Sequence, residues 1–135
     1  GYDYPDEFFD VIVFRGTIQH LETPFAVLKK CTRLLKKNGL MAFLSTPNAN
    51  SICYRLFGDL PFLKSELNFF IPSDTTLKTS LTNFGLEVVN VRYPYWGTPY
   101  AKPLRDHIFF LLRCVGFRLP FPFWRNIMEL YAVKR

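Results

Sequence analysis

The stretch FFDVIVF, residues 8–14, decides the fold together with LMAFL, residues 40–44. Both runs are short and almost entirely apolar, which is typical of strands buried on both faces of a parallel sheet. Between them, Thr23-Pro24 is the pattern of a helix start and Asn38-Gly39 that of a helix end. The enclosed segment has apolar residues at helical spacing: Val27, Leu28, Cys31, Leu34 and Leu35. A strand, a helix and a second strand form a β–α–β unit, whose right-handed crossover makes the two strands parallel.

The rest of the sequence continues the alternation of helices and strands. Residues 93–103 contain three prolines and a glycine, so they are expected to form a loop. The other expected elements are, in order, helices over residues 52–57 and 73–84, a strand over 86–91, a helix over 104–115 and a strand over 128–133. This order predicts an α/β fold.

The composition bounds the class of protein. A chain of 135 residues that is 49% hydrophobic and 18% aromatic forms one domain with a packed core. Its longest apolar runs, such as Ile108–Leu112, have about five residues, and a membrane-spanning helix needs about 20. The cysteines Cys31, Cys53 and Cys114 match neither a disulfide framework nor a metal site. They are predicted to be buried free thiols in a reducing compartment, the cytoplasm.

The first residue is Gly1 and the first methionine is Met41, so we expect that the sequence does not begin at a native start. The charge of +6 is also unevenly placed, since residues 93–135 hold 7 Lys and Arg but 2 Asp and Glu. This asymmetry predicts an anionic partner for the last third of the chain.

Five stretches resemble one enzyme family in their order and spacing. They are Phe9-Asp10-Val11-Ile12; Gln19-His20-Leu21 with Pro24; LLKKNG at 34–39 with STPN at 45–48; Asn68-Phe69-Phe70 with 77–89; and residues 123–134. With them, almost the whole chain resembles the C-terminal half of a class I S-adenosylmethionine-dependent methyltransferase. The nearest group is the small-molecule type that includes the ubiquinone-biosynthesis methyltransferases.

The resemblance implies a single domain over residues 1–135, with a partial Rossmann-like sheet and flanking helices. The sheet would contain the family's strands four to seven, the last one antiparallel, and residues 93–127 would be a basic aromatic insert. The sequence lacks the family's strands one to three, and with them the glycine-rich loop and the acidic residue that hold most of the cofactor. This stretch alone is therefore predicted to bind the cofactor weakly.

The resemblance also implies site residues. Arg15, Gly16, Thr17 and His20 are expected to contact S-adenosylmethionine, because they follow a strand at the edge where open α/β sheets bind ligands. His20 is also the candidate general base, since an imidazole titrates near neutral pH. The alternatives are an ordinary strand-to-helix turn at 15–17 and a structural histidine.

Further candidates follow the second strand and lie in the middle of the chain. Pro47 and Asn48 are expected to contact the substrate, although an asparagine amide also holds turns. Glu66 is a candidate acid or base only by its position, and His107 is expected to be structural. No metal is predicted, because Gly16 stands where metal-assisted quinone methyltransferases have an acid.

Residues 102–125 interleave basic and aromatic side chains. Three interpretations stay open for this segment. It is a lid over the substrate cavity, an element that meets an anionic membrane or a lipid-linked substrate, or a surface for single-stranded nucleic acid. No RNA-binding fingerprint supports the last interpretation, so no nucleic acid is predicted.

The function predicted from these patterns is methyl transfer from S-adenosylmethionine to a small-molecule acceptor, with a hydroxyl group as the expected target. The alternative is a docking module without enzymatic activity that uses residues 102–125 on an anionic membrane or a partner. Self-association through the edge of an incomplete sheet is also expected.

Overall fold

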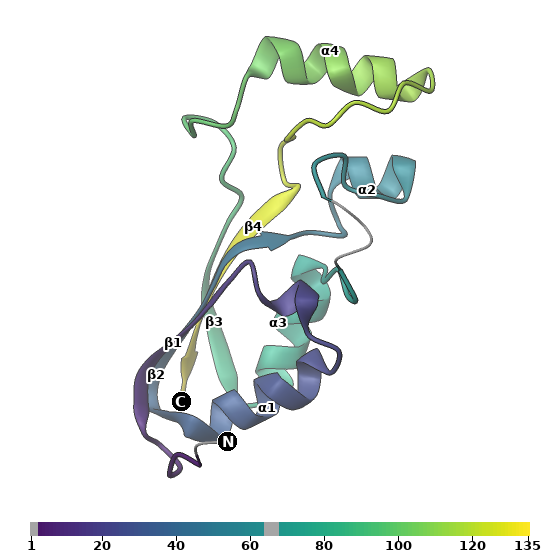
Figure 1. The fold of residues 1–135 in the computed structure, drawn as a ribbon. Helices are drawn as coiled ribbons and strands as arrows, with labels where there is room; N and C mark the ends of the chain where they lie inside the picture. Colours follow the sequence, from purple (N-terminus) through teal and green to yellow (C-terminus); the bar gives the residue numbers. More distant parts are fainter. Residues whose placement is uncertain (1–2, 64–67) are drawn as a thin grey trace.

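The computed structural model describes residues 3–63 and 68–135 (Figure 1). Glu66 lies outside the described residues. The elements are β1 (Phe9–Arg15), the 3₁₀ turn η1 (Ile18–His20), α1 (Pro24–Leu34), β2 (Leu35–Pro47), α2 (Ile52–Phe57), α3 (Asp74–Asn83), β3 (Leu86–Arg92), α4 (Pro103–Cys114) and β4 (Ile127–Lys134).

The four strands form one sheet in the order β1-β2-β4-β3. Strands β1 and β2 are parallel, and β4 runs antiparallel to both β2 and β3. The expected α/β fold and the antiparallel last strand are therefore confirmed. Residues 11–15 of β1 pair in step with residues 40–44 of β2, and Pro47 at the end of β2 lies opposite Ile127 at the start of β4. One edge of the sheet thus gathers the ends of β1 and β2 and the start of β4.

The main core lies between the sheet and the helices α1 and α3, which cover the same face of the sheet (Figure 1). Its fully buried members include Leu28 of α1, Phe43 of β2 and Leu81 of α3. The rings of Phe14 and Phe43 stack at 5.0 Å between centroids, which joins β1 to β2. Burial of such side chains is the main force that holds the helices on the sheet.

The prediction that residues 8–14 are buried on both faces is wrong. Val11 and Val13 are 52% and 53% exposed, whereas Phe14 on the opposite face is buried. The reason is topological, because both α1 and α3 lie on the opposite face of the sheet, the face of Phe14.

The predicted end of the first helix at Asn38-Gly39 is also wrong. Helix α1 ends at Leu34, and β2 begins at Leu35, which is fully buried and pairs with Phe9. The pairing then shifts to Val11 with Leu40, and Asn38 has a positive φ of 63° inside this bulge. A Cβ at Gly39 would meet the Lys36 carbonyl oxygen at 2.8 Å, so the Asn-Gly pair shapes a β-bulge instead of a helix end.

Helix α4 packs away from the sheet, at the top of Figure 1. It confirms the helix expected at 104–115, displaced by one residue, and joins a second, smaller core built on Cys53, Leu60 and Phe121. Cys53 is buried as predicted, whereas Cys31 is only partly buried and Cys114 is exposed, since it lies at the C-terminal end of α4. None of the described helices is long and apolar enough to cross a membrane.

Candidate functional site

The carboxyl edge of the sheet holds the candidate site. There the turn after β1, the end of β2, the residues after β3 and the start of β4 come together. In open α/β sheets, this edge is where ligands bind, because the loops that follow neighbouring strands diverge and leave a crevice.

The turn after β1 presents Arg15 and Thr17 to solvent, with Gly16 half-buried between them. Gly16 has a φ of 56°, which most residues other than glycine adopt only with strain, and its N–H donates to the Leu44 carbonyl at 2.9 Å. A Cβ at Gly16 would meet nothing closer than Gln19 Nε2 at 3.8 Å and the Ser45 carbonyl oxygen at 3.9 Å. The turn is therefore held against β2, and a Cβ at Gly16 would be in ordinary contact with Gln19 and Ser45.

His20 and Gln19 lie on η1, directly after this turn. His20 is exposed, and its backbone N–H donates to the Thr17 carbonyl at 3.0 Å. Gln19 is buried, and its carbonyl accepts hydrogen bonds from the backbone N–H groups of Phe69 and Phe70 at 2.9 and 3.2 Å. The sequence did not reveal this attachment, since a backbone contact leaves no residue signature.

Pro47 and Asn48 are both buried at the end of β2. The Asn48 side-chain oxygen accepts from the backbone N–H groups of Asn50 at 3.0 Å and Asp74 at 3.1 Å. Its backbone N–H donates to the Asn126 carbonyl at 2.9 Å. Asn48 thus joins the loop after β2 to the start of α3 and to the residue before β4.

Asp74, at the start of α3, is the centre of a polar cluster that the sequence did not reveal. Its carboxylate accepts from Asn50 Nδ2 at 2.6 Å, from the Tyr93 hydroxyl and from Arg125 at 3.1 Å. The Arg125 guanidinium also lies 4.3 Å from the centre of the Tyr93 ring. Burial raises the pKa of Asp74, but the hydrogen bonds from Tyr93, Asn50, Thr75 and Arg125 outweigh it and lower the pKa to about 2. Asp74 is therefore a fixed anion that ties four segments together at the site edge.

A cavity of about 680 Å³ lies beside the end of β2, with mostly aromatic and apolar walls. Its lining residues are Ser45, Phe62, Pro94, Tyr95, Thr98, Pro99, Tyr100, Lys102, Pro122, Phe123, Ile127 and Glu129. We call it the edge pocket. The sequence pattern does not reveal this pocket, although one signal is present: the acid Glu129 interrupts the apolar run MELYAV, and its side chain lines the pocket.

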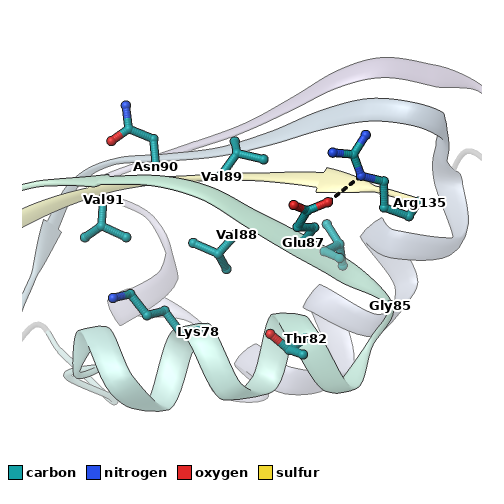
Figure 2. Close-up of a pocket in the computed structure, with 10 residues that line it drawn as sticks. Lys78, Thr82, Gly85, Glu87, Val88, Val89, Asn90, Val91 and Arg135 are labelled. Atoms are coloured by element: carbon teal, nitrogen blue, oxygen red, sulfur yellow. Dashed lines mark hydrogen bonds and ion pairs between the residues drawn. The ribbon is translucent and has the colours of Figure 1, made fainter.

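A second cavity of about 690 Å³ lies along the edge strand β3, between this strand and α3 (Figure 2). Lys78 and Thr82 rise from α3 toward the strand, while Val88 and Val91 point down toward the helix. This groove begins at Gly85, at the amino end of β3, so it lies away from the turn after β1. The edge pocket is therefore the better candidate for a ligand.

Metal ligands do not cluster in the described part of the chain. Among residues 3–63 and 68–135, no group of three or more His, Cys, Asp or Glu side chains has the geometry to hold a metal ion.

Comparisons with known proteins identify the family. The sequence model of a methyltransferase domain matches residues 1–91. No curated protein sequence matches the chain significantly.

Many solved structures share the fold. One is the YcgJ protein from Bacillus subtilis, with a TM-score of 0.64 and 15% sequence identity over 100% of this chain and 68% of that protein. A SAM-dependent methyltransferase from Archaeoglobus fulgidus matches with a TM-score of 0.59 and 19% identity, over 96% of this chain and 61% of its own. One from Methanosarcina mazei matches with a TM-score of 0.59 and 14% identity, over 99% and 63%. The chain thus spans between 61% and 68% of the length of these three proteins.

The sequence match covers more than half of the chain, and the strand order, the antiparallel last strand and the shared fold agree with it. The chain therefore belongs to the methyltransferase domain family, with the class I methyltransferase fold, and S-adenosylmethionine is the cofactor that this membership implies.

Proposed function

We propose that this chain takes part in the O-methylation of a small apolar or aromatic molecule. The observation that carries the proposal is the position of Ser45, which lines the edge pocket and whose carbonyl oxygen lies 3.9 Å from the Cβ position of Gly16. The expected cofactor turn and a cavity of suitable size for a small molecule are thus neighbours. Such adjacency is what a transfer between two bound molecules needs.

The turn at the carboxyl edge suits the cofactor. Arg15 and Thr17 are exposed there, and Gly16 between them is half-buried, with a positive φ of 56°. We assign the binding of S-adenosylmethionine to Arg15, Gly16, Thr17 and His20. When bound, S-adenosylmethionine supplies a methyl group that is already activated on a sulfonium.

The protein's own contribution is then to orient the acceptor and to take up a proton. Phe62, Tyr100 and Phe123 offer flat apolar walls for the acceptor, and His20 is proposed as the general base for its hydroxyl proton. Pro47 and Asn48 support acceptor binding by fixing the loop after β2, since both are buried and Asn48 makes four hydrogen bonds with backbone groups. A cytoplasmic location is part of this proposal, and the three cysteines are free thiols.

Nuclear magnetic resonance titration of the isotope-labelled chain tests this assignment, because it also detects weak binding. S-adenosylhomocysteine is expected to shift the backbone amides of residues 15–17 and 20. The aromatic alcohol 1-naphthol is expected to shift those of Thr98, Tyr100 and Glu129. Absence of shifts at saturating ligand, or shifts confined to the groove between α3 and β3, would overturn the proposal.

A second candidate is docking without chemistry through residues 102–125. It is favoured by the exposure of apolar side chains on α4, such as Leu104 and Leu111. The titration separates the two candidates, because a docking module has no reason to bind S-adenosylhomocysteine at residues 15–17.

A further inference from the structure

The outward face of α4 is a continuous apolar stripe. Leu104, Ile108, Leu111 and Val115 follow one another at spacings of four, three and four residues, which places them on one face of the helix. They are 80%, 48%, 65% and 73% exposed, and Phe117 just beyond the helix is 60% exposed. We call these five residues the α4 stripe. Single exposed apolar residues are ordinary, but a contiguous stripe marks an interaction surface.

The inward face of α4 is fixed by specific contacts, so the stripe faces away from the protein. Asp106 is fully buried and accepts from the Tyr95 hydroxyl at 3.0 Å. The ring of Phe110 stacks on that of Phe123 at 4.8 Å between centroids. These contacts leave the stripe on the side of the helix opposite the second core.

The charges around the stripe are basic. Residues 102–118 contain four cations, Lys102, Arg105, Arg113 and Arg118, and a single acid, Asp106. Arg105 pairs with Asp106 and Arg113 with Asp59, whereas Lys102 is exposed just before the helix and Arg118 is exposed a few residues after it. A helix with one apolar face and cations at its borders has the pattern of an element that lies in the interface of an anionic membrane.

We propose that α4 docks this chain on an anionic lipid bilayer. The α4 stripe enters the boundary between headgroups and acyl chains, and Lys102 and Arg118 contact the anionic headgroups. Charge complementarity selects this occupant, because the residues that flank the stripe carry net positive charge and the whole chain has a charge of +6.

Docking has a consequence for the acceptor, which rests on the proposed function. Tyr100 and Lys102 line the edge pocket and directly precede α4, so a docked helix brings one wall of this pocket to the membrane surface. The acceptor class that suits this arrangement is a hydroxyl compound with an apolar body that partitions into the bilayer.

Co-sedimentation with lipid vesicles tests the docking. The chain is expected to sediment with vesicles of phosphatidylcholine containing about one third phosphatidylglycerol, and much less with phosphatidylcholine alone. The variant Leu111→Glu is expected to lose at least about tenfold in vesicle affinity, because it places a charge in the apolar boundary. The matched control is Leu56→Glu on α2, which replaces a leucine of similar exposure, 59%, outside the stripe. It is expected to bind like the unchanged chain.

The charged border has a test of its own. Arg118→Gln is expected to weaken binding to the anionic vesicles severalfold and to leave the small binding to neutral vesicles unchanged. Equal binding of the unchanged chain, Leu111→Glu and Leu56→Glu would overturn the proposal. So would a dimer in solution that Leu111→Glu dissociates without any vesicle binding, since the stripe would then be a contact between copies of the chain.

The vesicle experiment and the S-adenosylhomocysteine titration test the docking and the proposed function independently. Vesicle binding that depends on Leu111, in a chain whose residues 15–17 show no response to S-adenosylhomocysteine, supports the docking and overturns the methyl transfer. A normal response to S-adenosylhomocysteine without vesicle binding overturns only the docking.

Discussion

Asp74 is the residue whose charge contributes most clearly to the stability of the site edge. Its pKa is lowered from 3.8 to about 2 because its hydrogen bonds outweigh the cost of burial. A lowered pKa in the folded state stabilises the fold at every pH above the unfolded value near 3.8, and the contribution is lost as the pH falls through about 2. The shift corresponds to about 2 kcal/mol of unfolding free energy at neutral pH.

Replacing Asp74 by asparagine is therefore expected to cost about 2 kcal/mol near pH 7, and the difference from the unchanged chain is expected to shrink below about pH 4. Chemical unfolding at a series of pH values measures it. Asp10→Asn is the control, since Asp10 pairs with Lys36 on the surface, where ion pairs contribute little. A pH-independent loss in the Asp74 variant would contradict the electrostatic origin.

Gly16 is the second informative position, because it has a positive φ of 56° and a Cβ there would contact Gln19 and Ser45. Gly16→Val is expected to weaken S-adenosylhomocysteine binding at least about tenfold, since a β-branched residue is strained at positive φ and shifts the turn. Gly58→Val is the control. Gly58 has a similar φ of 69° at the end of α2, and its Cβ would meet nothing within 4 Å. Equal binding by both folded variants, at the level of the unchanged chain, would remove Gly16 from the site.

The positions of candidate residues were predictable where they follow from the end of a strand. Arg15, Gly16 and Thr17 were expected at a ligand edge, and they lie at the carboxyl end of β1 beside Ser45. Partners distant in sequence were not predictable, because nothing local links Asp74 to Arg125 or Tyr95 to Asp106. The edge pocket was missed for the same reason.

At the scale of elements, α4 depends on a single buried carboxylate. Asp106 accepts from the Tyr95 hydroxyl, from the Lys102 backbone N–H at 2.9 Å and from the Arg105 guanidinium at 2.6 Å. Burial, together with the hydrogen bond to Asp106, raises the pKa of Tyr95 to about 12. Helix α4 is thus attached to the preceding loop through this carboxylate. The rings of Phe109 and Phe110 attach it to the smaller core.

Asp106→Ala is expected to release α4 while the sheet stays folded, because the two cores are separate and removing the acceptor leaves buried donors without partners. Hydrogen exchange is expected to speed up at residues 103–114 and to remain slow in β2 and β4. In the same variant, the pKa of Tyr95 is expected to fall toward 10, which an ultraviolet titration measures. Uniform acceleration across the sheet would show that α4 is part of one cooperative unit.

Element types were predictable from local patterns, and one boundary was not. Ser73 caps the start of α3 and Gly58 the end of α2, as these residue types favour, since capping is a local effect. The pair Asn38-Gly39 suits a helix end and a β-bulge equally well. The pairing of the buried Leu35 with Phe9 decides between the two structures. That contact depends on a strand 26 residues earlier in the sequence, which a local pattern does not report.

At the scale of the molecule, the sheet has one covered face and one open face. Val11, Val13 and Val89 are each about half exposed on the open side, and β1 is an edge strand with unpaired backbone groups. An edge strand with apolar neighbours pairs readily with another chain. The incomplete sheet expected from the sequence therefore has a second surface for contact with other chains, separate from the α4 stripe.

We accordingly predict self-association through β1. Light scattering is expected to give a mass above that of a monomer, increasing with concentration, and Val13→Lys is expected to shift it toward the monomer because a charge on an edge strand blocks pairing. Leu56→Lys is the matched control on α2, with a similar exposed fraction, and is expected to leave the mass unchanged. Leu111→Glu separates the two surfaces, since association that it abolishes while Val13→Lys does not would assign the contact to α4. A monomeric mass for the unchanged chain at all concentrations would mean that the open face is tolerated without a partner, and the prediction would be wrong.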